Sequence, residues 1–479
     1  MSGKGMKRRM YEQLCILGYY LYYKYWLRFR DRAGLERWQK RRLRRHLSFV
    51  ARHSAIYRGK RRLEDFPKID KSFMMRNFKD LNTVGIGRKE AEDFAVRAER
   101  ERDFAPRLRG VTVGLSSGTS GRRGIFLVSE AERMRWAGYI LAKFLPGSIR
   151  RAYSIAFFMR ADSNLYQSVG SRRIRFYFFD IYRDMEEHRK RLEEIRPQIL
   201  VGQPSVLLML AEEQERGRLG ICPERVISIA EVLEQADEAR LKRVFGQEVI
   251  HQVYQCTEGC LAATCRCGTL HLNEDVVYIE REYLDEFRFV PVVTDFERRA
   301  QPIIRYRLND ILKERKEPCS CKSPCLALEK IEGREDDVFI FQGKEGGQKK
   351  VFPDFIRRCM LFAEKGEDCR QYREADICGG KKPAGGGENP SDKETGYGGG
   401  ESEYRVVQEG DGRILVYADL TADGQQRVRE EFVHLAEEQR WILPKLLFRP
   451  YVQERGKKMK RVERRCQNHE DTEEDENRT

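Results

Sequence analysis

Residues 111–124 read VTVGLSSGTSGRRG, so a short apolar run leads into closely spaced hydroxyl and glycine residues and then two arginines. Glycines let successive backbone N–H groups point toward one anion, while hydroxyl and cationic side chains add binding groups. We predict a phosphate site, although an ordinary turn has a similar composition and the spacing is not that of a P-loop. The residues predicted to surround the phosphate are Ser116, Ser117, Gly118, Thr119, Ser120 and Gly121.

A second group of polar residues, YQCTEG at 254–259, directly follows an apolar run. Open α/β sheets bind their ligands at the carboxyl ends of strands. The residue types suit a nucleotide, with Tyr254 stacked on a purine, Thr257 on a phosphate and Glu258 bound to Mg²⁺. A buried tyrosine beside a surface ion pair is the alternative interpretation.

Two further stretches carry charge. RYRLND (305–310) ends in Asp310, whose carboxylate suits the hydroxyl groups of a ribose. IEGREDDVF (331–339) places Arg334 beside three acidic residues at a predicted domain boundary. A solvated run of charge would have the same composition.

Cysteines concentrate in one region, since seven of the thirteen fall between residues 256 and 325. TCRCGTLH (264–271) and CSCKSPC (319–325) are two Cys-x-Cys turns, and two such turns can close a tetrahedral Zn²⁺ site. The number of ligands favours a structural zinc ion, with free buried thiols as the alternative. The predicted zinc ligands are Cys265, Cys267, His271, Cys319 and Cys321.

Apolar runs alternate with helical patterns from residue 111 to about residue 330, which predicts an α/β sheet with crossover helices at 186–196, 205–217 and 234–245. The predicted strands are VTVGL, YSIAFF, QILVG, RVISIA and EVIHQVY. A small α+β domain is expected from residue 334 onward, interrupted by a flexible Gly-rich insert at 378–401. The acidic tail at 466–479 is predicted to be disordered.

The first 62 residues carry 19 Lys and Arg against three acidic residues, which accounts for the whole net charge of +15. Within this basic arm, residues 14–29 are apolar and aromatic but too short to span a bilayer. We predict a helix packed on the first domain, with peripheral contact to an anionic membrane as the alternative. No nucleic-acid partner is expected, and cysteines without an export signal favour the cytoplasm.

In order and spacing, these motifs resemble the adenylate-forming superfamily, in particular the branch of phenylacetate–CoA ligase and the deazaflavin-coenzyme adenylyltransferases. The resemblance covers residues 50–353, and its motifs are HSAIYR, FPKIDK, SSGTSG, PQILVGQPSVL, YQCTEG, LHLNED, PIIRYRLND, GREDD and VFP. It resumes at GKKMKRV (456–462). It implies a large α/β ATP-binding domain of mixed sheets and helices, residues 63–333, and a small mobile α+β domain, residues 334–465.

The resemblance also implies a reaction. A carboxylate oxygen of an aryl or acyl acid attacks the α-phosphorus of ATP, pyrophosphate leaves, and CoA or another acceptor takes the acyl group. The residues named above would hold the phosphates, the adenine, Mg²⁺ and the ribose, with Arg334 at the hinge. In this family the mobile domain supplies a lysine, which is Lys458 if the final Arg-Val is aligned and Lys457 if Gly-Lys is aligned.

Two alternatives to this reaction remain open, namely AMP transfer to a phenolic hydroxyl of a coenzyme and a non-catalytic nucleotide-binding or membrane-associated scaffold. Gln255 stands where relatives commonly have glycine, so the acceptor is the least constrained part of the prediction. By position, residues 154–168, 176–182 and 228–231 are expected to line the acceptor pocket.

Overall fold

The computed structural model describes residues 3–101, 103–116, 123–159, 166, 168–365, 403–410, 412–452 and 460–465. The chain forms two compact units, of which the first comprises mainly Met1–Ile331 and the second begins at Glu332. The Gly-rich insert at 378–401 and the acidic tail at 466–479 lie outside the described residues.

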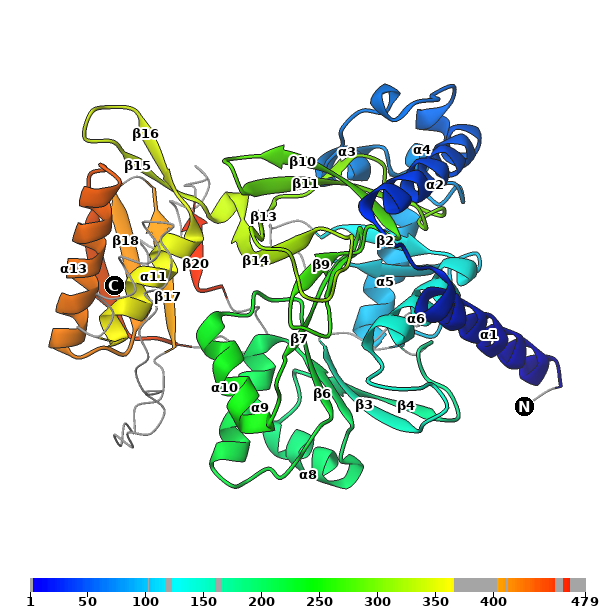
Figure 1. Ribbon diagram of the computed structural model, residues 1–479, viewed down its shortest axis with the longest axis horizontal. Helices are drawn as coiled ribbons and strands as arrows, with labels where there is room; N and C mark the ends of the chain where they lie inside the picture. The colour runs from blue at the N-terminus through cyan, green and yellow to red at the C-terminus, as the bar shows by residue number, and fades with distance from the viewer. Residues whose placement is uncertain are drawn as a thin grey trace. The chain divides into compact units, whose positions relative to one another are not determined.

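The first unit is built on a sheet of twelve strands, half of which is parallel (Figure 1). The parallel strands, in their order across the sheet, are β4 (Ile174–Asp180), β3 (Tyr153–Met159), β5 (Ile199–Gly202), β6 (Arg225–Ile229) and β7 (His251–Cys256). Apolar runs at β3, β5, β6 and β7 were expected from the sequence, and these four strands are confirmed. The chain reverses its direction across the sheet between β3 and β5, which is where open α/β sheets bind ligands.

The other half of the sheet is antiparallel and continues from β7. Its strands are β8 (Gly259–Thr264), β9 (Leu270–Leu272), β14 (Ala327–Arg334), β13 (Asp310–Glu314), β11 (Arg288–Asp295) and β10 (Val277–Tyr283), with β12 (Tyr306–Arg307) paired to β11. The antiparallel strands place the residues around 306 and 310 in the same sheet as residue 254 of β7.

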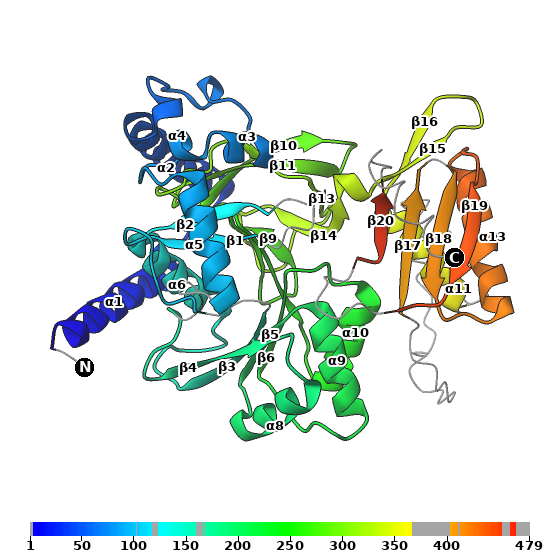
Figure 2. The ribbon, with the colours of Figure 1, turned by 180° about the vertical axis from the view of Figure 1, so that it is seen from behind.

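Helices cover both faces of the parallel half. Phe158 and Phe179 stack on one face against His188 of α8 (Met185–Ile195). Helices α9 (Pro204–Glu215) and α10 (Gln235–Phe245) lie side by side near α8 (Figure 2). All three helices were predicted from the sequence and are confirmed. The opposite face is covered by α6 (Glu130–Phe144).

A two-stranded hairpin precedes α6, formed by β1 (Thr112–Leu115) and β2 (Ile125–Val128). The α6 helix begins with a capping box, in which the Ser129 N–H donates to Glu132 Oε2 at 2.5 Å and the Glu132 N–H donates to Ser129 Oγ at 3.4 Å. Helix α5 (Arg88–Glu101) contacts both strands of the hairpin.

The basic arm is helical and packs on the first unit, as the preferred interpretation of its sequence predicted. It comprises α1 (Gly3–Leu21), a π-helical turn at Tyr22–Trp26 and α2 (Arg32–His53). Two short helices, α3 (Lys71–Arg76) and α4 (Phe78–Leu81), follow after the arm. Helix α1 crosses α6 at Gly138, where a Cβ atom would lie 2.5 Å from Tyr19 Cβ and 2.8 Å from the Ile16 carbonyl oxygen. No helix among the described residues is long and apolar enough to cross a membrane.

The second unit has a four-stranded sheet in the order β19 (Lys445–Arg449), β18 (Arg413–Ala418), β17 (Tyr404–Glu409) and β20 (Val462–Arg465). Helices α11 (Pro353–Lys365) and α13 (Ala422–Glu438) pack against each other, and β15 (Phe339–Gln342) pairs with β16 (Gln348–Val351). Phe341 stacks on the buried Trp441 at 4.1 Å between ring centroids, which joins this hairpin to the core of the unit.

The α1–α6 crossing generates a matched pair of substitutions. Gly138→Ala should lower the free energy of unfolding by about 1–3 kcal/mol, because the added methyl group overlaps α1. Gly18→Ala adds a methyl group to α1 at a position where no atom lies within 4 Å of it. This substitution should stabilise the protein by about 0.5–1 kcal/mol. Denaturant unfolding checks both values, and equal effects would contradict the close crossing.

Candidate active site

The turn between β7 and β8 carries the YQCTEG residues. A register shift between Tyr254 and Gln255 marks a β-bulge in this hairpin, and bulges re-aim side chains next to functional sites. Gly259 begins β8, where a Cβ atom would lie 2.8 Å from Asp295 Oδ2, so a larger residue would displace that carboxylate. The turn therefore rests directly on the buried Asp295 side chain.

Two tyrosine hydroxyls orient two carboxylates at this end of the sheet. The Tyr254 hydroxyl donates to Asp310 Oδ2 at 2.5 Å, and the Tyr306 hydroxyl hydrogen bonds to Glu258. Burial and the neighbouring carboxylates raise the pKa of both tyrosines well above the usual range. At neutral pH both hydroxyls therefore keep their protons and act as donors. The structure thus brings three predicted site residues, Tyr254, Glu258 and Asp310, into one cluster.

Arg298 connects this cluster to β2, the strand that follows the hydroxyl–glycine turn (SSGTSG, residues 116–121). Its Nη1 donates to the Thr257 carbonyl oxygen at 2.8 Å, and its Nη2 donates to the Leu127 carbonyl oxygen at 3.2 Å. Gln301 supports the same strand, because its Oε1 accepts from the Leu127 N–H at 2.9 Å and its Nε2 donates to the Ile125 carbonyl oxygen at 3.1 Å. No sequence motif predicted a role for Arg298, because the two carbonyl oxygens that it binds belong to residues far away in the sequence.

The base of the hydroxyl–glycine turn is closed by Ser116 and Gly124. The Ser116 N–H donates to the Gly124 carbonyl oxygen at 2.7 Å, and the Gly124 N–H donates to Ser116 Oγ at 2.6 Å. Arg123, one of the two arginines that end the turn, forms an ion pair with Glu99 of α5 at 2.5 Å. Ser117, Gly118, Thr119, Ser120, Gly121 and Arg122 lie outside the described residues.

Lys71 brings a cation to the base of the turn, although the sequence analysis assigned it no role. A Cβ atom at Gly124 would lie 3.3 Å from Lys71 Cε. Two backbone hydrogen bonds fix the chain just before Lys71. The Ile69 N–H donates to the Arg305 carbonyl oxygen at 3.0 Å, and the Arg307 N–H donates to the Ile69 carbonyl oxygen at 2.8 Å. The only sequence signal for this arrangement is the FPKIDK motif itself.

An apolar cavity of about 120 Å³ lies between α6 and one face of the parallel strands. Alternate residues of each strand point into it, as the period of two requires. Its lining includes Trp136, Ile140, Phe157, Met159, Phe176, Val201, Ile229 and Gln255. All three stretches expected to line an acceptor pocket contribute to this cavity, and Gln255 is the residue that follows Tyr254.

Among the remaining predicted residues, Arg334 belongs to the second unit. Arg334 ends β14, and the pKa of nearby Asp337 is raised by burial against the opposing effect of Lys460. Lys460 Nζ lies 2.9 Å from Asp337 Oδ1 in an ion pair. Lys457 and Lys458 lie outside the described residues.

Four of the five predicted zinc ligands converge. The ligand atoms of Cys265, His271, Cys319 and Cys321 lie within 4.8 Å of one another. Cys265 Sγ is 3.7 Å from Cys319 Sγ, and Cys321 Sγ is 3.4 Å from His271 Nε2. A tetrahedral zinc ion with Zn–S bonds of about 2.3 Å separates two sulfurs by about 3.8 Å, so the cluster fits a closed zinc site.

Cys267 is not part of the cluster, so its prediction as a zinc ligand is wrong. Its side chain is exposed, and its N–H donates to Cys265 Sγ at 3.3 Å. Hydrogen bonds from Thr269, the Cys321 N–H and His271 outweigh burial and lower the pKa of Cys319 to about 5. His271 Nδ1 lies 3.0 Å from the Cys325 carbonyl oxygen, a contact that fixes the imidazole orientation.

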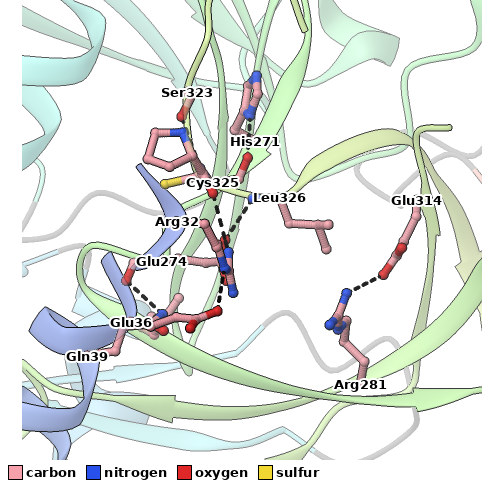
Figure 3. A network of polar contacts seen from close by, with 12 residues as sticks. Arg32, Glu36, Gln39, His271, Glu274, Arg281, Glu314, Ser323, Cys325 and Leu326 are labelled. Carbon is pink, nitrogen blue, oxygen red and sulfur yellow. Dashed lines mark hydrogen bonds and ion pairs between the residues drawn. The ribbon is translucent and has the colours of Figure 1, made fainter. Parts of the chain in front are cut away.

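The cysteine loop is tied to the basic arm through Glu274, as Figure 3 shows. Glu274 Oε2 accepts from Arg32 Nη1 at 2.6 Å and from the Leu326 N–H at 2.7 Å. On the next turns of α2, Gln39 Nε2 donates to the Glu274 carbonyl oxygen at 3.0 Å and Trp38 Nε1 donates to the Asp275 carbonyl oxygen at 3.0 Å. The LHLNED motif therefore has a structural role in anchoring α2.

Comparisons with known proteins agree with this architecture. No family model matches the chain. Indoleacetate–lysine synthetase of Pseudomonas savastanoi is 26% identical over 266 residues, which cover 51% of this chain and 63%, less than two thirds, of that protein. A crystal structure of 2-hydroxyisobutyryl-CoA ligase in complex with 2-HIB-AMP matches 90% of this chain and 88% of its own, with a TM-score of 0.58 at 17% identity.

An open conformation of the same ligase, in complex with 2-HIB-AMP and CoA, matches 90% of this chain and 92% of its own, with a TM-score of 0.52 at 17% identity. At this level of identity the match shows that the chain shares the fold of this ligase. The predicted α/β fold class with a C-terminal domain is thereby confirmed.

The buried Asp295 generates a pH-dependent prediction. Burial raises its pKa to about 7, with Glu132 adding to the effect and Arg298 opposing it. Between about pH 4 and pH 7 the native state therefore holds a proton that the unfolded chain has released. The free energy of unfolding should fall as pH rises through this window, by at most about 4 kcal/mol.

Asp295→Asn should abolish this fall, whereas the exposed Asp93→Asn should retain it. Denaturant unfolding at several pH values measures the slope. An unchanged slope in Asp295→Asn would assign the pH dependence to other groups.

The cysteine cluster generates a prediction about metal content. The purified protein should contain stoichiometric zinc, Cys319→Ser should lose it, and Cys267→Ser should keep it. Because a metal that binds only the native state stabilises it, chelation should cost roughly 3 kcal/mol at about a hundredfold excess of zinc over its dissociation constant. Elemental analysis and thermal unfolding provide the readouts, and zinc loss in Cys267→Ser would contradict the assigned ligands.

Proposed function

We propose that the protein adenylates a carboxylic acid with ATP and releases pyrophosphate. The observation that carries the proposal is the position of the apolar cavity, whose Gln255 adjoins the cluster of Tyr254, Glu258 and Asp310. An acid seated in the cavity would present its carboxylate at the strand end where the nucleotide residues gather. The chain shares its fold with a ligase whose structure contains 2-HIB-AMP, and this similarity supports the proposed reaction.

The roles of the site residues follow from their chemistry. A carboxylate oxygen bonds to the α-phosphorus while the bond from that phosphorus to pyrophosphate breaks. The hydroxyl–glycine turn and Thr257 hold phosphate oxygens, Tyr254 packs on the adenine, and Asp310 accepts from the ribose hydroxyls. Glu258 suits Mg²⁺, which would neutralise phosphate charge. Arg334 lies at the start of the second unit, and Lys458, or Lys457 in the other alignment, would supply a cation to the α-phosphate.

The cavity indicates the class of acid. Its lining is hydrocarbon and aromatic apart from Gln255 and the polar edges of Trp136 and Tyr166, so the body of the acid carries no charge. An engineered protein cavity of about 150 Å³ holds benzene, which makes about 120 Å³ suitable for a small aromatic ring. The name of the bacterial relative includes indoleacetate, an aryl acid. We therefore favour an aryl acid over a long acyl chain.

The second half-reaction transfers the acyl group to an acceptor. The similar ligase structure contains CoA, and the bacterial relative is named for lysine, so a thiol and an amine are the two acceptors to compare. We place this chemistry in the cytoplasm, with peripheral membrane contact through the basic arm, because the cysteines of the chain suit a reducing compartment.

ATP–pyrophosphate exchange over a panel of aryl and acyl acids tests the proposal. At least one small aryl acid should support exchange, and Asp310→Ala should raise the KM for ATP by about tenfold to a hundredfold through loss of a charged hydrogen bond. Val201→Phe narrows the cavity, so it should raise the KM for the acid and leave the KM for ATP unchanged.

Lys458→Ala and Lys457→Ala identify which lysine contributes to exchange. ATP binding without exchange for any acid would overturn the ligase proposal. AMP transfer to a phenol would then support the coenzyme-modifying alternative, and the absence of any transfer would support a scaffold.

A further inference from the structure

Helix α1 presents a continuous apolar face to solvent. Met10, Leu14, Leu17 and Leu21 follow one another at intervals of four, three and four residues, which places them along one side of the helix. All four side chains are exposed, and so is Trp26 at 76%. Seven of the fifteen exposed large hydrophobic side chains of the described residues fall within residues 10–26.

The opposite side of α1 is already used for packing. Ile16 is buried against α6, Arg135 lies 5.0 Å from the Tyr19 ring centroid, and the Tyr23 ring contacts Tyr139 at 4.9 Å. The close crossing at Gly138 fixes the rotation of the helix about its axis. The apolar face of α1 therefore cannot turn inward without breaking the contacts that hold the helix.

Positive charge surrounds this apolar face. Residues 1–30 contain seven Lys and Arg and a single acidic residue, Glu12. Glu12 lies on the packed side, where its carboxylate is 3.0 Å from Arg133 Nη2. In the described part of the chain, Lys7 and Arg9 form no ion pair, and both are exposed. Their charge remains directed to solvent.

The apolar face of α1 and the positive charge beside it together favour one kind of partner. A second copy of the chain would cover the apolar face but would bring two sets of cations together, which opposes association. An anionic lipid surface satisfies both features, because acyl chains receive the leucines and headgroups attract the cations. Tyr25 and Trp26, exposed at the end of the face, are of the types enriched at membrane–water interfaces.

We propose that the apolar face of α1 docks in the interface of an anionic membrane, with the helix lying along the surface. This inference is independent of the adenylation reaction, since it uses no residue of the nucleotide site. It locates the contact surface on Met10, Leu14, Leu17, Leu21 and Trp26.

Co-sedimentation with vesicles tests the proposal on the full chain without ATP. The protein should bind phosphatidylcholine vesicles that contain phosphatidylserine, and bind vesicles of phosphatidylcholine alone weakly. A double variant, Leu14→Ser with Leu17→Ser, should bind at least about tenfold more weakly, because both side chains lose apolar burial. Lys7→Gln and Arg9→Gln should each weaken binding by about fivefold, the equivalent of about 1 kcal/mol per cation.

The matched control is Val96→Ser, which removes an exposed apolar side chain from α5 and should leave binding unchanged. Thermal unfolding of each variant separates lost binding from lost folding. A blue shift of tryptophan fluorescence on vesicle binding, which should disappear in Trp26→Phe, reports burial of the apolar face. Equal weakening in the control and the double variant would overturn the proposal. So would retention on RNA in place of vesicles, or dimer formation that the leucine substitutions abolish.

Discussion

The guanidinium group of Arg298 joins two parts of the first unit that are remote in sequence and that carry residues predicted to bind a nucleotide. One nitrogen holds the backbone before Glu258, and the other holds the strand after the hydroxyl–glycine turn. Charge-assisted bonds to two carbonyl oxygens fix a distance that neither strand sets by itself.

Burial of the two tyrosines adds a second constraint. Tyr254 and Tyr306 remain protonated because their surroundings penalise the phenolate, so each offers a permanent donor to a carboxylate. A carboxylate held in one orientation before its ligand arrives needs less reorganisation when it binds. The alternation of side chains along β7 serves the same end, because Tyr254 faces the cluster while Gln255, the next residue, faces the cavity.

Local signals in the sequence predicted much of the fold. Four parallel strands were recognisable as apolar runs, and the Ser129–Glu132 capping box marked the start of α6. By contrast, β4 alternates apolar residues with Arg175 and tyrosine, and the antiparallel strands are short or charged, so their assignment needs partners that lie far along the chain. The same limit explains Arg123, whose partner Glu99 belongs to a separate helix, and Cys267, whose backbone rather than thiol faces the cluster.

The cysteine cluster also lies close in sequence to the point where the chain passes from the first unit to the second. Strand β14 starts two residues after Cys325, pairs with β9 at Ala327–His271 and Leu328–Leu270, and only then passes from the first unit to the second between Ile331 and Glu332. An ion bound by His271, Cys319 and their neighbours would lock the root of this strand. Loss of the metal would therefore loosen the start of the strand that leads into the second unit, and it would leave the apolar cavity, which contains no residue of the cluster, in place.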